Sequence, residues 1–182
     1  MMRYVIWITV IIMAILLRVW LATSKELSFD ESFTITLGLG LDLSRAVYQF
    51  SQPVMQHPVQ ILESFSALKG MANLANLSVY LADLNPPLYF LITGPWILAT
   101  SMQTLWLRLP VVIMSLGSAY YFYRLLTRFV SKTFALFGLA VMAFSSIHLF
   151  YGALARPYEM MLLLALVATL TLLNRNSLAS GS

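Results

Sequence analysis

Two adjacent carboxylates, Asp30 and Glu31, are the residues best placed to do chemistry in this chain of 182 residues, which is 60% hydrophobic and only 10% charged. Neighbouring side chains point in different directions on a helix or a turn. One carboxylate could therefore act as a general base while the other binds a metal ion or holds an arginine. The alternative is a pair of acids that is merely solvated in a loop or placed at a helix N-terminus.

A second polar stretch precedes the double proline Pro86-Pro87. The two prolines favour an extended entry followed by a helix start, where the missing N–H groups need no partner. Asp83 and Asn85 lie just before that start. They are either site residues or parts of a rigid loop in which Asn85 caps the helix.

Two arginines complete the candidates. Arg156, close to Tyr158, lies at the start of an apolar run and could bind a phosphate through its forked donors. An interfacial Arg–Tyr anchor is the alternative. Arg18 lies near the end of the first apolar run, where it either snorkels to the interface or faces an anionic head group near Asp30.

The composition indicates the setting of these residues. The mean hydropathy is +0.82, which is too apolar for a soluble domain of this size and predicts an integral membrane protein in a lipid bilayer. The absence of Cys excludes disulfides and thiolate metal sites. The chain has no run of basic residues, so its charge pattern does not indicate a nucleic-acid partner.

Four apolar segments are long enough to cross the bilayer: 4–22, 109–126, 133–151 and 158–173. We interpret the first as an uncleaved helix rather than a signal peptide, because it is longer than a typical signal core. Segment 88–101 is short and interrupted by Gly94-Pro95, so it is either a kinked span or a surface or re-entrant segment. Segments 33–43 and 59–75 show the spacing of short surface helices.

Charge favours four spans. If 88–101 does not span, all seven acids fall on one side of the membrane, and the following bases fall on the other side: Arg3, Arg124, Arg128, Lys132 and Arg175. The positive-inside rule then predicts a multi-pass protein with cytoplasmic termini and residues 23–107 outside.

Several of these stretches, in their order along the chain, resemble the N-terminal part of the GT-C membrane glycosyltransferases, in the branch of the protein O-mannosyltransferases and the bacterial aminoarabinose transferases. The matching stretches are Arg18, Asp30-Glu31, Asp83-Leu84-Asn85-Pro86-Pro87-Leu88-Tyr89-Phe90 with Trp96, Leu107-Arg108-Leu109-Pro110, His148 to Tyr151, and Ala155-Arg156-Pro157-Tyr158. The chain departs from the family pattern at Asn85, where the family has His, at Ala153-Leu154, which replace a polar pair, and in a longer loop 31–86.

The resemblance implies an all-α integral membrane protein: a GT-C-like helical bundle with about four spanning helices and outer-face juxtamembrane helices. Residues 1–182 would form a single membrane domain, the front portion of a longer GT-C module, with 23–107 as an outer loop. The implied location is the bacterial inner membrane.

The resemblance also implies a reaction: inverting transfer of a sugar from a polyprenyl-phosphate-linked donor to a hydroxyl acceptor on lipid, glycan or protein. Asp30 would be the general base, and Glu31 would assist it or help Asp30 hold a divalent cation, Mg or Mn. Arg156, with Arg18 or Arg108, would neutralise the departing lipid phosphate. The remaining substrate-site residues would be Asp83, which shapes the acceptor site, Asn85 and Tyr158. The alternatives are an inactive or truncated family member and a non-catalytic scaffold or transporter fragment.

Overall fold

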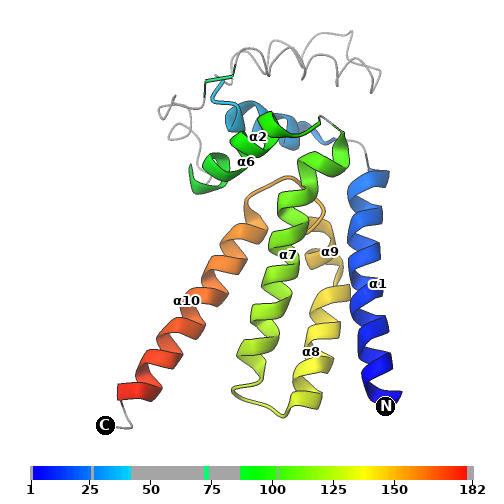
Figure 1. Ribbon diagram of the computed structural model, residues 1–182, viewed down its shortest axis with the longest axis vertical. Coiled ribbons are helices and arrows are strands. Elements are labelled where there is room, and N and C mark those ends of the chain that lie inside the picture. The colour runs from blue at the N-terminus through cyan, green and yellow to red at the C-terminus, as the bar shows by residue number, and fades with distance from the viewer. Residues whose placement is uncertain (1, 26, 42–71, 74–86, 102, 180–182) are drawn as a thin grey trace. The chain divides into compact units, whose positions relative to one another are not determined.

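The computed structural model describes residues 2–25, 27–41, 72–73, 87–101 and 103–179. All regular secondary structure in these ranges is α-helical, as predicted (Figure 1). The helices are α1 (Met2–Ser24), α2 (Phe29–Gly38), α6 (Pro87–Ala99), α7 (Thr104–Leu126), α8 (Lys132–Phe144), α9 (Ser146–Tyr151) and α10 (Tyr158–Ala179).

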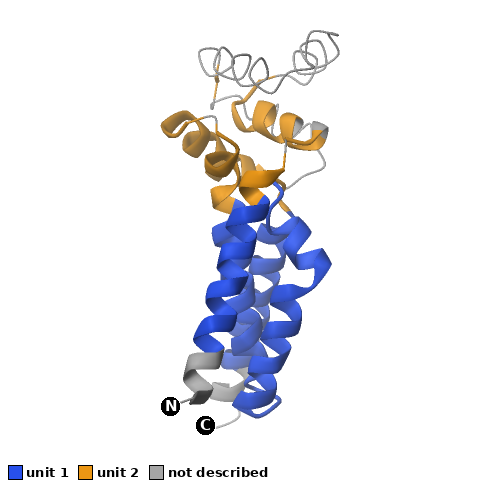
Figure 2. Ribbon diagram, turned by 90° about the vertical axis from the view of Figure 1, so that its right-hand side faces the viewer, with its two compact units in different colours: residues 1–21, 111–154, 158–182 blue, residues 22–110, 155–157 orange. Residues whose placement is uncertain are grey.

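The chain forms two compact units (Figure 2). Unit 1 comprises Met1–Leu21, Val111–Leu154 and Tyr158–Ser182, and therefore holds most of α1 and α7 together with α8, α9 and α10. Unit 2 comprises Ala22–Pro110 and Ala155–Pro157, and holds α2, α6 and the first two turns of α7. The expectation of a single membrane domain over 1–182 stays a prediction.

Three helices of the described chain are long and apolar enough to cross a membrane, at Trp7–Ser24, Thr104–Leu126 and Tyr158–Arg175. They correspond to three of the four predicted spans. The fourth, 133–151, is divided at Ser145 into α8 and α9, because Ser145 is extended and its Oγ accepts a hydrogen bond from the His148 N–H at 3.3 Å. At 13 residues, α8 is about 20 Å long, shorter than the hydrocarbon core.

Local sequence signals define both ends of α2. Ser28 is the N-cap of a capping box, in which its hydroxyl accepts from the Glu31 N–H and its own N–H donates to the Glu31 carboxylate. At the other end Gly40 has φ 70°, and its N–H donates to the Leu37 carbonyl. The helix thus starts four residues earlier than the predicted surface helix 33–43. Most of the predicted helix 59–75 lies outside the described residues.

Helix α6 begins at Pro87, as the double proline predicts, and packs against α2. Gly38 permits the close approach, since a Cβ there would lie 3.3 Å from Ile97 Cδ1. The core of unit 2 consists of Ile35, Leu39, Leu41, Ile97 and Leu107. With 13 residues α6 is shorter than a typical membrane span, which agrees with a surface or re-entrant course for 88–101.

Candidate active site at the start of α2

The second carboxylate of the acid pair, Glu31, holds an arginine. Its Oε1 accepts from Arg108 Nε at 2.7 Å and its Oε2 accepts from Arg108 Nη2 at 2.8 Å, so the guanidinium and the carboxylate meet through two parallel bonds. Both side chains are buried, with 0% of Glu31 and 1% of Arg108 exposed. Of the two partners expected for one carboxylate of the pair, a metal ion or an arginine, the structure shows the arginine.

Backbone groups complete this ion pair. Glu31 also accepts hydrogen bonds from the N–H groups of Ala155, at 2.8 Å, and Ser28, at 2.9 Å. Arg108 Nη1 donates to the carbonyls of Ala22 and Lys25. Burial by itself would raise the pKa of the Glu31 carboxyl, but hydrogen bonds from Arg108, Ala155 and Ser28 and the charge of Arg108 hold that pKa below its ordinary value. Glu31 is therefore ionised at neutral pH. We call its buried ion pair with Arg108 the brace, because the pair holds these segments together.

The first carboxylate, Asp30, has a different environment. Asp30 is exposed, although it belongs to the same helical turn as Glu31. Its backbone carbonyl accepts a hydrogen bond from Arg156 Nη1 at 3.3 Å, and the same nitrogen donates to Thr34 Oγ1 at 3.4 Å. The structure therefore brings together Asp30 and Arg156, which are far apart in the sequence. The Asp30 carboxylate is exposed and can accept a proton, and the guanidinium that contacts its backbone can stabilise a developing negative charge.

Tyr89 is a neighbour to which the sequence motifs assign no role. Its side chain is buried beneath this site, with 1% exposed. Burial and the negative charge of Glu31 raise the pKa of the phenol, while Arg156 opposes that shift. The side chain is thus a neutral phenol that packs edge-to-face on Phe90. The sequence signals were its place in the first turn after the double proline and its membership of the motif stretch 83–90.

The donor set does not fit the predicted divalent cation. Both Glu31 oxygens lie within 2.8 Å of guanidinium nitrogens, and a cation at the same oxygens would face the charge of Arg108. No cluster of three or more acidic, His or Cys side chains suited to a metal ion occurs among the described residues. Glu31 is therefore occupied by Arg108 and is not available to bind a divalent cation.

The other predicted residues have different environments or lie outside the described residues. Arg108 is committed to Glu31, and Asp83 and Asn85 lie outside the described residues. Tyr158 is the first residue of α10 in unit 1, is 41% exposed, and stacks edge-to-face on Tyr151 at 4.7 Å between ring centroids. Arg18, also in unit 1, is buried inside its unit rather than exposed at a surface.

Arg18 belongs to a second polar cluster, which lies within unit 1. Its Nε donates to Ser115 Oγ at 2.9 Å, and its Nη2 lies 2.5 Å from His148 Nδ1. His148 Nε2 in turn lies 3.6 Å from Glu159 Oε2. The sequence motifs gave His148 and Glu159 no role. The signal that could have found them is the presence of ionisable residues in or beside apolar helices, which is rare without a buried partner.

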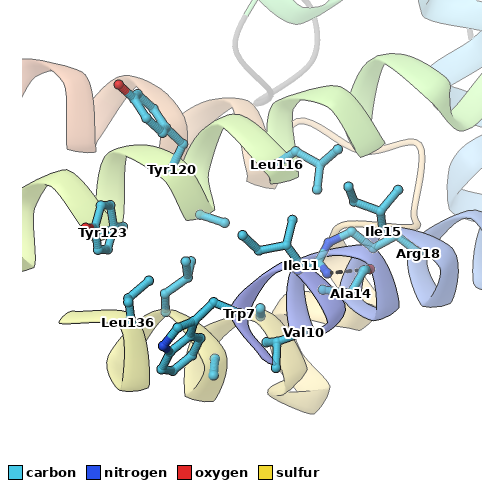
Figure 3. A pocket seen from close by; sticks show the side chains of 14 residues that line it. Trp7, Val10, Ile11, Ala14, Ile15, Arg18, Leu116, Tyr120, Tyr123 and Leu136 are labelled. Carbon is cyan, nitrogen blue, oxygen red and sulfur yellow. Dashed lines mark hydrogen bonds between the residues drawn. The ribbon is translucent and has the colours of Figure 1, made fainter. Parts of the chain in front are cut away.

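Unit 1 also contains a cavity of about 410 Å³ between α1, α7 and α8 (Figure 3). The lining is almost wholly apolar, and the sticks in Figure 3 show Trp7 and Tyr123 toward one end and Arg18 toward the other. Such a lining accepts a hydrocarbon chain rather than a polar molecule.

The described residues thus contain two buried charged clusters, one in each unit, and in unit 2 an exposed acid, Asp30, whose backbone carbonyl contacts the half-buried Arg156. Comparison with models of known families, with curated proteins and with solved structures finds no match to this chain.

Proposed function

We propose that this chain belongs to a GT-C-type membrane glycosyltransferase, which moves a sugar from a polyprenyl-phosphate-linked donor to a hydroxyl acceptor on the outer face of the membrane. The observation that carries the proposal is the exposed residue Asp30, whose backbone carbonyl accepts a hydrogen bond from the half-buried guanidinium of Arg156. The resemblance in sequence motifs supplies the donor class, and the three apolar helices support a membrane setting.

The reaction is a direct displacement. Asp30 takes the proton of the acceptor hydroxyl, and the acceptor oxygen attacks the anomeric carbon of the donor sugar. The bond from that carbon to the phosphate oxygen breaks, the polyprenyl phosphate leaves, and the configuration inverts. Arg156 stabilises the negative charge that develops on the departing phosphate.

Glu31 and Arg108 act as positioning residues in this scheme. Their ion pair ties the first turn of α2 to the end of α1, to the start of α7 and to the backbone beside Arg156. Because Ala155 N–H donates to Glu31 and the next residue contacts the Asp30 carbonyl, one buried carboxylate fixes both members of the exposed pair. Glu31 thereby assists Asp30 without holding a cation.

Two apolar features suit a lipid-linked donor. The cavity of unit 1 has a lining that an isoprenoid chain can fill. In unit 2, α6 exposes Leu88, Leu91 and Ile92 on the side away from its buried residues. Trp96 donates to the Trp106 carbonyl at 2.8 Å, which places two tryptophans together as in a membrane-interface belt. Asp83 remains a proposed acceptor-site residue, and Asn85 remains a proposed substrate-binding residue.

A second candidate is a non-catalytic membrane protein such as a transporter fragment. The buried cluster of Arg18, His148 and Glu159 favours it, because ionisable residues inside a helical bundle often mark ion or proton paths. That alternative assigns no role to the exposed Asp30 or to Arg156. Substitutions in the two units therefore separate the two functions.

The test is sugar transfer in membranes that contain the protein, with a polyprenyl-phosphate-linked radiolabelled sugar as donor. Asp30→Asn preserves size and removes the base, so the rate should fall about 10²–10⁴-fold. Binding of the donor should persist. Asp42→Asn makes the same chemical change elsewhere and should leave the rate intact. Full transfer by Asp30→Asn would contradict the proposal.

The membrane topology that this function requires can be tested separately, by cysteine labelling. The proposal places both termini in the cytoplasm and residues 23–107 outside. Since the chain has no Cys, a single Cys at Ser78 or at Thr127 is a unique label site. An impermeant thiol reagent should label the Ser78 position from outside and spare the Thr127 position. Outside labelling at Thr127 would overturn this topology.

A further inference from the structure

Three ionisable residues from three helices meet inside unit 1. Arg18 lies in α1, His148 in α9 and Glu159 in the first turn of α10. They are 0%, 5% and 2% exposed. The imidazole lies between the other two, with Nδ1 2.5 Å from Arg18 Nη2 and Nε2 3.6 Å from Glu159 Oε2. The arrangement is therefore a chain, not a direct pair of opposite charges.

The chemistry of the three groups determines where the protons are. A guanidinium has five N–H donors and no acceptor. His148 Nδ1 must therefore accept from Arg18, and an imidazole with an accepting nitrogen is neutral. Its single proton then sits on Nε2, the atom that faces Glu159. A second proton on Nδ1 would set one N–H against another N–H.

We propose that Arg18 fixes His148 as the neutral imidazole with its proton on Nε2, and that the three residues form a proton-sensitive lock which joins α1, α9 and α10. In the closed lock, Arg18 donates to His148 and His148 donates toward Glu159. Protonation of Nδ1 removes the acceptor for Arg18 and brings two cations together, so α1 is released from α9. This inference is independent of sugar transfer.

The surroundings of His148 support this assignment. Arg18 from α1 and Glu159 from α10 are the charged groups that face it; on α7, Ser115 accepts from Arg18 and Ser118 donates to the Glu159 carbonyl. The sequence of α8 has one charged residue, the exposed Lys132. Among the described atoms, His148 Nε2 and Glu159 Oε2 are buried without a hydrogen bond at 3.5 Å or less, and they lie 3.6 Å from each other.

The electrostatics agree with the geometry. Burial and the positive charge of Arg18 lower the pKa of His148 to about 4 from the ordinary 6.5. The lock should be closed at neutral pH and open in acid.

The protonation state can be measured directly, because the chain has only two histidines. His57→Gln leaves His148 as the single one, and the protein with ¹⁵N-labelled histidine is studied by NMR in lipid nanodiscs. At pH 6 an ordinary histidine is mostly protonated, whereas His148 should give the shifts of a neutral ring with the proton on Nε2. A charged ring, or a neutral ring with the proton on Nδ1, would overturn the proposal without any further substitution.

Substitution then tests the role of Arg18. Arg18→Met removes the donor and the charge, so His148 should populate both neutral tautomers and take up a second proton at higher pH. Arg124→Met is the matched control, since it removes an arginine of the same unit that contacts Tyr120 at an exposed position. It should leave the His148 signals in place. Equal changes of the His148 signals in both variants would mean that Arg18 does not specifically determine the protonation state of the ring.

The lock itself is tested through its acid sensitivity. His148→Asn keeps an acceptor near the Nδ1 position and cannot titrate. In the His57→Gln background, the melting temperature of the parent should fall relative to that of the His148→Asn variant between pH 6.5 and about 4, because the unfolded chain takes up the His148 proton first. A slope that is the same with and without His148 would contradict the lock.

Discussion

The two buried clusters each contain an arginine and a carboxylate, but only one of them brings the two into direct contact. In unit 2, Arg108 and Glu31 meet directly through two hydrogen bonds of 2.7 and 2.8 Å, and backbone groups occupy their other positions. In unit 1, an imidazole separates Arg18 from Glu159, and the 3.6 Å approach of His148 to Glu159 is longer than a hydrogen bond.

This difference teaches how each cluster responds to a change of proton or side chain. A saturated ion pair has no alternative state at neutral pH, because removing either partner leaves a buried charge unmatched. The cluster with an imidazole has a spare proton site, and His148 can gain charge when a neighbour is lost. The pair of unit 2 is therefore a static brace, and the chain of unit 1 is adjustable.

The largest effect should come from breaking the brace. Arg108→Met leaves the buried Glu31 carboxylate without its cation and should lower the free energy of unfolding by about 3–5 kcal/mol. Arg18→Met should cost less, about 1–3 kcal/mol, because His148 can take up the lost charge. The measurement is chemical unfolding in micelles, with the exposed Arg124→Met as control at roughly 0–1 kcal/mol. Equal losses for Arg108 and Arg18 would remove the distinction between the clusters.

A steric change should disturb the adjustable cluster alone. A Cβ at Gly152 would lie 2.5 Å from Ser115 Oγ and 2.7 Å from the His148 carbonyl. Gly152→Ala should therefore displace Ser115 from Arg18 and cost about 1–3 kcal/mol. Ser115→Ala in the same chain should recover part of that loss. Gly117→Ala is the control, since its Cβ would meet only the flexible end of Leu163 at 3.3 Å. Similar losses for Gly152→Ala and Gly117→Ala would show that the network is not involved.

The contrast also shows what sequence patterns can predict. Helical ranges follow from apolar length and from local signals, so α1, α7 and α10 and the start of α6 at Pro87 were predictable. The break at Ser145 was not, because 133–151 is evenly apolar and the cap that divides it is one hydroxyl. A serine inside an apolar run is compatible with either outcome.

The sequence predicted which residues belong to the site better than it predicted which of them contact each other. Motif order brought Asp30, Glu31, Arg108 and Arg156 forward, and an arginine was among the expected partners of one carboxylate. The identity of that partner required the fold, because Glu31 and Arg108 are 77 positions apart. The cluster of Arg18, His148 and Glu159 was missed, since its members come from three separate helices and no local pattern links them.

Acid should separate the two clusters by pH window. The pKa of Glu31 is below its ordinary 4.5 in the folded protein, so the unfolded chain binds its proton first as the pH falls. The stabilisation from the brace is complete above about pH 4.5 and is lost below it as Glu31 protonates. Glu31→Gln should remove this part of the acid dependence and leave the His148 part, between pH 6.5 and about 4, in place. An unchanged profile below pH 4.5 in Glu31→Gln would contradict the role of Glu31 as an ionised brace.

The smallest effect concerns the exposed pair that the brace positions. Thr34 and Thr36 are both buried in α2, and each hydroxyl donates to the carbonyl four residues earlier, at 3.1 and 2.9 Å. Thr34 differs because its Oγ1 also accepts from Arg156 Nη1, at 3.4 Å. Thr34→Val and Thr36→Val should therefore destabilise the protein similarly, by about 0.5–1.5 kcal/mol. Thr34→Val alone should also weaken binding of a polyprenyl phosphate, by about threefold, because a single long hydrogen bond is worth roughly 0.6 kcal/mol at most. Equal binding by the two variants would show that Arg156 is positioned by the Asp30 carbonyl without Thr34.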